Sequence, residues 1–273
     1  QDIVTINDCE FKNHKGQQNL VPNQDGFSEG HRNLNLESNT LYDGETSQLI
    51  SLEHFTVHPE IPHQAVIKKT LFEGNRFNGE YEEAFIRVHQ DTIAVGVSLD
   101  ISDNQFVKNQ VRNSNLNTSL FAINGASDLS FVGNKFLQNN AMEGAPSREM
   151  VEANSLHHFG KLIDISFAQR GLNHTEKYSE IHDNVFTQNG VLAYCFRMQH
   201  MPSGLLIKNF DMHGNVILYE SLLRFDDGLD LTIVNWIAEG NQGKILEIEH
   251  TPGAYQGDLV IQESKFISND LCE

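Results

Sequence analysis

The stretch from Leu99 to Asn109, LDISDNQFVKN, is followed thirty residues later by a second version of itself, LSFVGNKFLQN, from Leu129 to Asn139. The two versions share apolar residues, an asparagine and a phenylalanine at matching places. Related motifs continue toward both ends of the chain, and their anchor residues are Phe11, Leu41, Phe77, Phe106, Phe136, Phe186, Met212, Ala238 and Phe266. The chain therefore consists of nine copies of a unit of about 30 residues, separated by loops of variable length.

Short runs of alternating apolar and polar residues lie between these motifs. Residues 85–88 (FIRV), 162–165 (LIDI) and 222–225 (LLRF) are examples, and such runs are typical of strands with one buried face. A unit with two or three short strands and no helix cannot bury its apolar face alone, so neighbouring units must stack. We therefore predict an all-β fold, a right-handed parallel β-helix of about nine coils, in which residues 1–273 form a single domain.

Asparagine is unusually frequent, with 27 residues among 273, and its positions are periodic. The same slot of successive coils holds Asn39, Asn75, Asn104, Asn134 and Asn184. Asparagine tolerates the left-handed backbone conformation of a sharp bend and can hydrogen-bond along a stack. We expect these five side chains to form a ladder, which gives way to an aromatic stack where Phe210 and Trp236 occupy the slot.

The composition excludes several classes of function. The 19 Lys and Arg residues against 37 Asp and Glu give a net charge of −18, which repels nucleic acid and anionic membranes. No stretch approaches the roughly 18 consecutive apolar residues of a membrane-spanning helix, so we expect no direct membrane insertion. The three cysteines, Cys9, Cys195 and Cys272, lie far apart and allow at most one disulfide within the chain.

The repeat resembles the parallel β-helix coils of the pectin-lyase-like superfold, which includes polysaccharide lyases, glycoside hydrolases and surface proteins. Its F-x-x-N elements, such as Phe106 to Asn109 and Phe136 to Asn139, are similar to those of polymorphic outer membrane proteins and of very large protist surface proteins. The GGA-[ILV] partner motif of the bacterial adhesins is absent. The resemblance covers nearly the whole chain and implies a fold, not an activity.

Few residues match the catalytic motifs of that superfold. Its polygalacturonase-like members carry NTD, paired Asp, GHG and RIK motifs, and here only Asp226, Asp227 and His213 correspond. Glycoside hydrolysis needs two carboxylates at a defined separation, so these three are weak catalytic candidates, and we expect a polar turn after Phe225. The superfold's pectate lyases bind calcium through acidic residues, and adventitious calcium binding at outward aspartates such as Asp164 is left open.

Two other sets of residues are candidates for a site. His54, His58 and His63 form the densest histidine cluster, but prolines make this segment a loop, and exposed loop histidines are favoured over a zinc site. Asn117 and Asn173 each begin an N-glycosylation sequence in a predicted loop. Together with the resemblance, these sequences favour a secreted or cell-surface protein.

The leading functional hypothesis is a non-enzymatic structural or interaction module, an acidic extracellular scaffold or adhesion segment. The alternative is a carbohydrate-active enzyme or carbohydrate-binding protein with the same fold. Both ends of the sequence read as the middle of a solenoid, so we expect a segment of a longer β-helix, or ends that contact other subunits. Carbohydrate is a further possible partner, and no cofactor other than calcium is expected.

Overall fold

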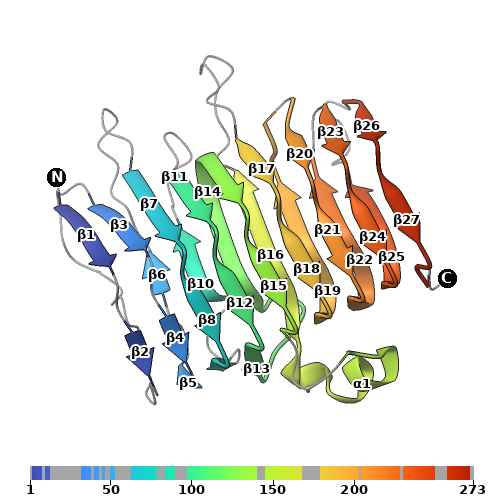
Figure 1. Ribbon diagram of the computed structural model, residues 1–273, viewed down its shortest axis with the longest axis horizontal. Helices are drawn as coiled ribbons and strands as arrows, with labels where there is room; N and C mark the ends of the chain where they lie inside the picture. The colour runs from blue at the N-terminus through green and yellow to red at the C-terminus, as the bar shows by residue number, and fades with distance from the viewer. Residues whose placement is uncertain are drawn as a thin grey trace.

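The computed structural model confirms the parallel β-helix (Figure 1). It describes residues 2–7, 10–12, 32–37, 40–42, 45–46, 50–52, 63–78, 84–89, 97–139, 145–167, 179–202, 204–227, 230–249 and 257–270. All of the strand pairings in this part of the chain are parallel, and successive coils lie side by side from the N-terminus to the C-terminus. The described part of the chain contains one six-residue α-helix, α1 (Arg148–Ala153), followed by a short 3-10 helix, η1 (Ser155–His157).

A nine-stranded sheet contributes one short strand to each coil and confirms the number of coils. In order, its strands are β2 (Glu10–Lys12), β4 (Thr40–Tyr42), β8 (Leu71–Glu73), β12 (Gln105–Val107), β15 (Lys135–Leu137), β18 (Val185–Thr187), β21 (Asp211–His213), β24 (Ile237–Glu239) and β27 (Lys265–Ile267). Each strand is only three residues long because a sharp turn precedes it and another follows it.

A 15-stranded sheet supplies the other two faces, as two ranks joined by the long strand β14 (Ser119–Val132). Besides β14, the first rank contains β1 (Asp2–Asn7), β3 (Arg32–Glu37), β7 (His63–Lys68), β11 (Val97–Ser102), β17 (Glu180–His182), β20 (Leu206–Lys208), β23 (Leu231–Val234) and β26 (Leu259–Gln262). The second rank adds β6 (Ile50–Leu52), β10 (Ala84–His89), β16 (Phe159–Phe167), β19 (Gly190–Gln199), β22 (Val216–Asp226) and β25 (Gln242–Glu249). A small third sheet pairs β5 (Glu45–Thr46), β9 (Arg76–Asn78) and β13 (Gln110–Arg112).

The core consists of columns of identical or similar side chains. Phe72, Phe106, Phe136 and Phe186 lie in register in four successive coils, with ring centroids 4.7 to 4.9 Å apart and nearly parallel planes. This distance is the spacing of adjacent β-strands, so the stack follows directly from repeating phenylalanine at one position of the coil. All four side chains are fully buried.

The predicted asparagine ladder exists at the turn that precedes the nine-stranded sheet. Asn104 donates from its backbone N–H and its side-chain amide to the Oδ1 atom of Asn134, at 3.2 and 3.0 Å. Asn134 donates in the same way to Asn184, at 3.0 and 3.1 Å. Each amide also donates to a main-chain carbonyl of the preceding coil, for example Asn104 to Ile67 at 2.8 Å. The ladder therefore satisfies backbone groups that the turn would otherwise bury unpaired.

A second and longer ladder follows the nine-stranded sheet and was not predicted. It contains Asn75, Asn109, Asn139, Asn189, Asn215, Asn241 and Asn269, each bonded to the next through Oδ1. The F-x-x-N elements of the sequence end on these asparagines. The two turns of one coil therefore use the same device, five residues apart.

The prediction for Asn75 was wrong in one respect. Asn75 bonds to Asn109 and belongs to the second ladder, and the first-ladder position of that coil is Thr70, whose N–H donates to Oδ1 of Asn104 at 3.1 Å. The anchor of this coil is accordingly Phe72, which lies in register with Phe106, and not Phe77. Asn39 lies outside the described residues. The error arose because apolar-x-x-Asn occurs at both turns, so a shift of five residues gives an equally good match.

Left-handed backbone conformations precede both ladders. The residues just before the first-ladder positions have φ between 48° and 68°, and they include Asp103, Gly133, Asp183, Asn209 and Asn235. Gly133 has φ 68°, and a Cβ there would lie 2.5 Å from Oδ1 of Asp103, so the Asp103 side chain would have to move. Asn and Asp dominate the other positions because they adopt this conformation at the lowest cost after glycine.

The first ladder ends where the predicted aromatic residues begin. Phe210 and Trp236 are buried at its next two positions, and in the described part of the chain each ring packs edge-on against a phenylalanine and not against the other ring. Phe210 packs edge-on against Phe196 at 5.3 Å, and Trp236 packs edge-on against Phe266 at 4.9 Å. The aromatic residues therefore replace the ladder as buried side chains at this corner.

Candidate functional site

One outward row of side chains crosses the second rank of strands. Strand register places Arg87, Ala122, Asp164, Arg197, Arg224 and Glu247 opposite one another in six successive coils. The next outward row contains Asn124, Ser166, Gln199, Asp226 and Glu249. We call these two rows together the charged face. It brings together register partners that lie 23 to 42 positions apart in the sequence.

Asp226 is the centre of this face. Its Oδ2 atom lies 2.6 Å from Nη2 of Arg197 in the preceding coil, and its Oδ1 atom lies 2.6 Å from Nε of Arg224 on its own strand. The side chains of Arg224 and Asp226 are only 13% and 12% exposed. Charge-assisted hydrogen bonds of this length in a partly buried site hold both guanidinium groups in fixed positions.

Tyr194 lies against the same two arginines. The guanidinium carbons of Arg197 and Arg224 lie 5.7 and 5.3 Å from the centre of its ring, and Arg224 donates to the Tyr194 hydroxyl at 2.7 Å. Burial raises the pKa of Tyr194, so the phenol is neutral at physiological pH. The ring therefore supports the arginines through cation–π contacts and does not add a negative charge.

Asp164 continues the charged face toward the N-terminus. Its Oδ2 atom lies 2.5 Å from Nζ of Lys161, and its Oδ1 atom accepts a 3.3 Å hydrogen bond from Gln199. Arg197 lies 4.0 Å away, so this basic side chain links Asp164 to Asp226. Lys161 and Arg197 thus pair with the carboxylates of Asp164 and Asp226 along this face.

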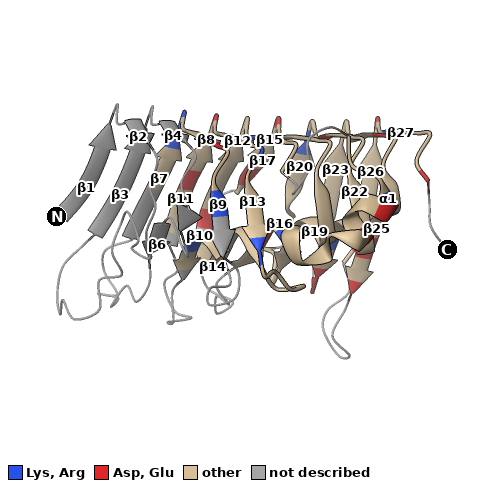
Figure 2. Ribbon diagram, turned by 90° about the horizontal axis from the view of Figure 1, so that it is seen from below, with Lys and Arg blue, Asp and Glu red and all other residues tan. Residues whose placement is uncertain are grey.

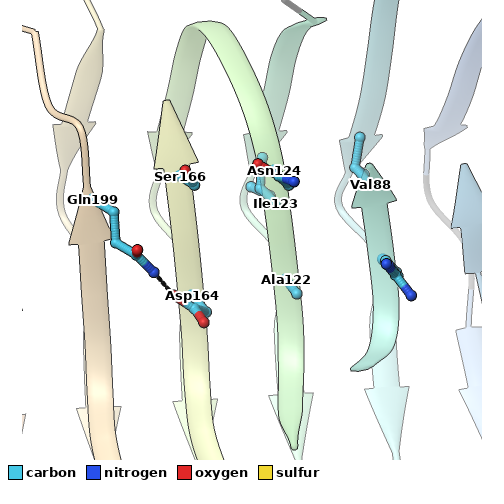
Figure 3. Close-up of a pocket in the computed structure, with 8 residues that line it drawn as sticks. Val88, Ala122, Ile123, Asn124, Asp164, Ser166 and Gln199 are labelled. Atoms are coloured by element: carbon cyan, nitrogen blue, oxygen red, sulfur yellow. Dashed lines mark hydrogen bonds between the residues drawn. The ribbon is translucent and has the colours of Figure 1, made fainter. Parts of the chain in front are cut away.

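A hollow of about 270 Å³ opens beside Asp164 (Figure 3). Ala122 lies at its base between Arg87 and Asp164, and the small side chain leaves the space that a longer one would fill. Asn124, Ser166 and Gln199 complete the polar lining. The hollow can accept a small molecule that both donates and accepts hydrogen bonds.

The predicted catalytic residues do not come together. Asp226 belongs to the charged face, and Asp227 follows it in a turn with φ 55°, its carboxylate 3.9 Å from Nδ1 of His200. His213 lies on β21 of the nine-stranded sheet, paired with Asp211 and 3.6 Å from Glu239. Because Asp226 ends β22 of the other sheet, His213 and Asp226 face different sides of the coil.

Only some of the remaining predicted site residues are described. His54, His58 and Asn173 are outside the described residues, while His63 is described by its backbone, which begins β7. No group of three or more His, Cys, Asp or Glu side chains in the described part of the chain could hold a metal ion. Asn117 is exposed in a turn.

Cys195 is a free and buried thiol, and burial raises its pKa. The side chain packs in the core among aliphatic and aromatic residues. It is therefore a structural residue, because a reactive thiol needs access and a lowered pKa. Cys9 and Cys272 lie outside the described residues.

The helix α1 lies beside β19 and β22 at one edge of the coil (Figure 2). Val151 of α1 packs with Leu192, Val216 and Leu218, and Arg148 donates to the carbonyl of Leu218 at 3.1 Å. The Ser147 side chain caps the helix by accepting from the N–H of Met150. This insertion is thus fastened to the coil body.

The fold and the charged face together define an elongated parallel β-helix with an outer surface of paired charges. Comparison of the chain with protein-family models, with curated proteins and with solved structures gives no match. In the described part of the chain, no helix has the length and apolar character needed to cross a membrane.

The charged face was missed in the sequence, although its signal was present. Its members are the polar residues inside the alternating runs, such as Asp164 in LIDI and Arg224 in LLRF. Aligning these runs on their buried residues, Ile163 with Phe196 and Leu223, gives the row directly.

Proposed function

We propose that the chain is a non-enzymatic structural or interaction module, a length of acidic extracellular β-helix within a larger assembly. The observation that carries this proposal is the pairing of Asp226 with two arginines. Both carboxylate oxygens already accept short, charge-assisted bonds, so the group fastens neighbouring coils and is poorly placed to exchange a proton with a substrate. Asp164, two coils earlier, is paired with Lys161 of its own strand.

A contact surface on coil nine supports an interaction role. Leu259, Val260, Ile261, Phe266 and Ile267 are 38% to 48% exposed, whereas Ile233 and Ala238, the coil-eight partners of Ile261 and Phe266, are fully buried. Apolar side chains and strand edges of this kind favour association with another strand edge. We propose that a further parallel coil, from the same chain or a partner subunit, covers this face.

Two measurements test the proposal. Antibodies against the chain should label intact cells, or the material around them, without permeabilisation, and labelling confined to permeabilised cells would contradict the extracellular assignment. Chemical crosslinking of native material should join Lys265, which is exposed on coil nine, to another polypeptide or to a further coil. Lys135, in the middle of the same sheet, is the control residue. It should not form such crosslinks, since coils cover its strand on both sides.

A second candidate function is carbohydrate binding, and the hollow beside Asp164 favours it. Its lining of guanidinium, amide, carboxylate and hydroxyl groups suits a sugar, which presents donors and acceptors in close proximity. The enzymatic version of this candidate requires that reducing or unsaturated sugar be released from a polysaccharide panel. That release would have to disappear in Asp226→Asn or Asp227→Asn.

Filling the hollow with a larger side chain tests whether a sugar binds there. Ala122→Leu adds a side chain at the base of the hollow, and Ser130→Leu adds the same group on the first-rank part of the same strand. If a polysaccharide retards the chain in affinity electrophoresis, Ala122→Leu should abolish the retardation and Ser130→Leu should preserve it. Equal effects of the two substitutions would remove the hollow from consideration as the binding site.

A further inference from the structure

A compact turn at residues 115–118 holds its shape through its own hydrogen bonds. The Thr118 N–H donates to the carbonyl of Asn115 at 3.1 Å, and the Asn115 N–H donates to Oγ1 of Thr118 at 3.0 Å. The Asn117 N–H donates to the side-chain oxygen of Asn115 at 2.8 Å. Three bonds within four residues fix the direction in which the tip of this turn points.

The turn is also fastened to the body of the coil. The Ser114 hydroxyl donates to the carbonyl of His158 at 2.6 Å, and the Lys161 N–H donates to the carbonyl of Thr118 at 3.0 Å. Gly160 lies so close that a Cβ there would be 2.4 Å from the carbonyl oxygen of Leu116. The turn therefore presents its tip from a rigid base.

Asn117 lies at this tip and differs from the ladder asparagines. Its side chain is exposed, and no described residue hydrogen-bonds to its amide, whereas Asn104, Asn109 and Asn134 are at most 1% exposed. It begins the acceptor sequence Asn117-Thr118-Ser119. A group attached to Nδ2 of Asn117 would extend into solvent without disturbing either ladder.

Two exposed leucines lie next to this position. Leu116 is 46% exposed and Leu156 is 60% exposed, and the Ser114 N–H donates to the Leu156 carbonyl at 3.0 Å, which brings the two segments together. Most of the other exposed large apolar residues in the described part lie on coil nine or on neighbouring β25. These leucines thus form a small separate apolar patch beside Asn117 that a bulky, hydrated group would cover.

We propose that Asn117 carries an N-linked glycan and that its first sugars cover Leu116 and Leu156. The transfer forms a bond between Nδ2 of Asn117 and C1 of the first sugar of a lipid-linked oligosaccharide. It breaks the bond from that sugar to the lipid pyrophosphate, and it releases the lipid pyrophosphate and one amide proton. Ser119, whose hydroxyl completes the acceptor sequence, is 1% exposed, so the transfer precedes closure of this coil.

The test is secretion of residues 1–273 behind an added leader in a eukaryotic cell that attaches N-linked glycans. Intact mass before and after enzymatic glycan removal is compared for the unaltered chain, Asn117→Gln, Asn173→Gln and Ser119→Thr. Asn117→Gln should lose the mass of one oligosaccharide, and Ser119→Thr, which keeps the acceptor hydroxyl, should retain it. An unchanged mass in Asn117→Gln would overturn the proposal.

A second readout concerns the leucine patch. Enzymatic glycan removal should increase the binding of an apolar fluorescent dye to the folded chain, and Leu116→Gln with Leu156→Gln, which creates no new acceptor sequence, should abolish that increase. Far-ultraviolet circular dichroism and the fluorescence of Trp236 confirm that each variant is folded. No change in dye binding on glycan removal would contradict the covering of the patch.

This inference rests on the proposed extracellular location. Peptide mass analysis of native material distinguishes a failure of the glycan proposal from a failure of the location. A chain at the cell surface whose Asn117 is unmodified would refute the glycan alone. A chain inside the cell, unmodified there yet glycosylated when the leader delivers it to the secretory route, would refute the location and with it the native glycan. A sugar on the Asn117 peptide of native material supports both.

Discussion

Replacing Asn139 with alanine should destabilise the coil far more than the loss of one polar side chain on a surface. Its Oδ1 atom accepts from the backbone N–H and the side-chain amide of Asn109, at 3.1 and 3.0 Å. Its Nδ2 atom donates to the carbonyl of Phe106 at 2.8 Å and to Oδ1 of Asn189 at 3.0 Å. At about 1 kcal/mol for each of these buried bonds, Asn139→Ala should lower the free energy of unfolding by about 4 kcal/mol.

The measurement is urea unfolding followed by circular dichroism and by the fluorescence of Trp236, the single tryptophan, in coil eight. Agreement between the two probes tests whether the coils unfold together, which a stacked repeat does not guarantee. Asn139→Asp retains the acceptor but directs a carboxylate at two acceptor oxygens, so it should lose at least as much stability as alanine.

The matched control is Asn235→Gly. Asn235 is an exposed asparagine that makes one described ladder-like bond, to Asn209 at 2.9 Å, and its φ of 56° suits glycine. In Asn235→Gly the free energy of unfolding should change by no more than about 0.5 kcal/mol. If Asn139→Ala lost less than about 1 kcal/mol, or no more than the control, the ladder would be a consequence of the fold and not one of its main supports.

Three further predictions concern other parts of the coil. Gly243→Ala places a Cβ 2.8 Å from the Ile217 carbonyl at φ 115°, so it should lose about 2 kcal/mol in urea unfolding; an unchanged midpoint would refute the strain. Burial lowers the pKa of His158 from 6.5 to about 4. Between these two pH values the imidazole is protonated in the unfolded chain and neutral in the folded chain. The free energy of unfolding should therefore fall by up to about 3 kcal/mol from pH 7 to pH 4. His158→Gln should remove that part of the pH dependence, and an unaltered profile would contradict it. Asp226→Asn leaves two arginines facing an amide, so it should lower the free energy of unfolding by about 3 kcal/mol. Asp227→Asn should lower it by about 1 kcal/mol or less. Equal losses would contradict the special role of Asp226.

The interior of this protein could be predicted well from its sequence because each coil repeats the same physical problem. Phe106 and Phe136 must stack because their strands are adjacent, and Asn104 and Asn134 must pair because the same turn recurs. The one error of register came from the similarity of the two turns in a coil. Thr70 in place of asparagine removed the residue that would have distinguished them.

The charged face could not be predicted in the same way because it does not repeat. Arg87, Ala122, Asp164, Arg197 and Arg224 share one position of the coil and have no residue type in common except arginine. Their proximity depends on loops of different lengths between the coils, so constant spacing gives no guide to it. Only the register of the buried neighbours identifies the row.

This difference indicates where function is encoded in such a chain. A column inside the coil must hold one kind of side chain, because each member packs on its copy above and below, as Phe72, Phe106 and Phe136 do. A row on the outside is free of that requirement, so the pairing of opposite charges there needs another cause. Arg197 between Asp164 and Asp226 joins three coils through their carboxylates. Pairing across coils resists separation of the coils along the axis.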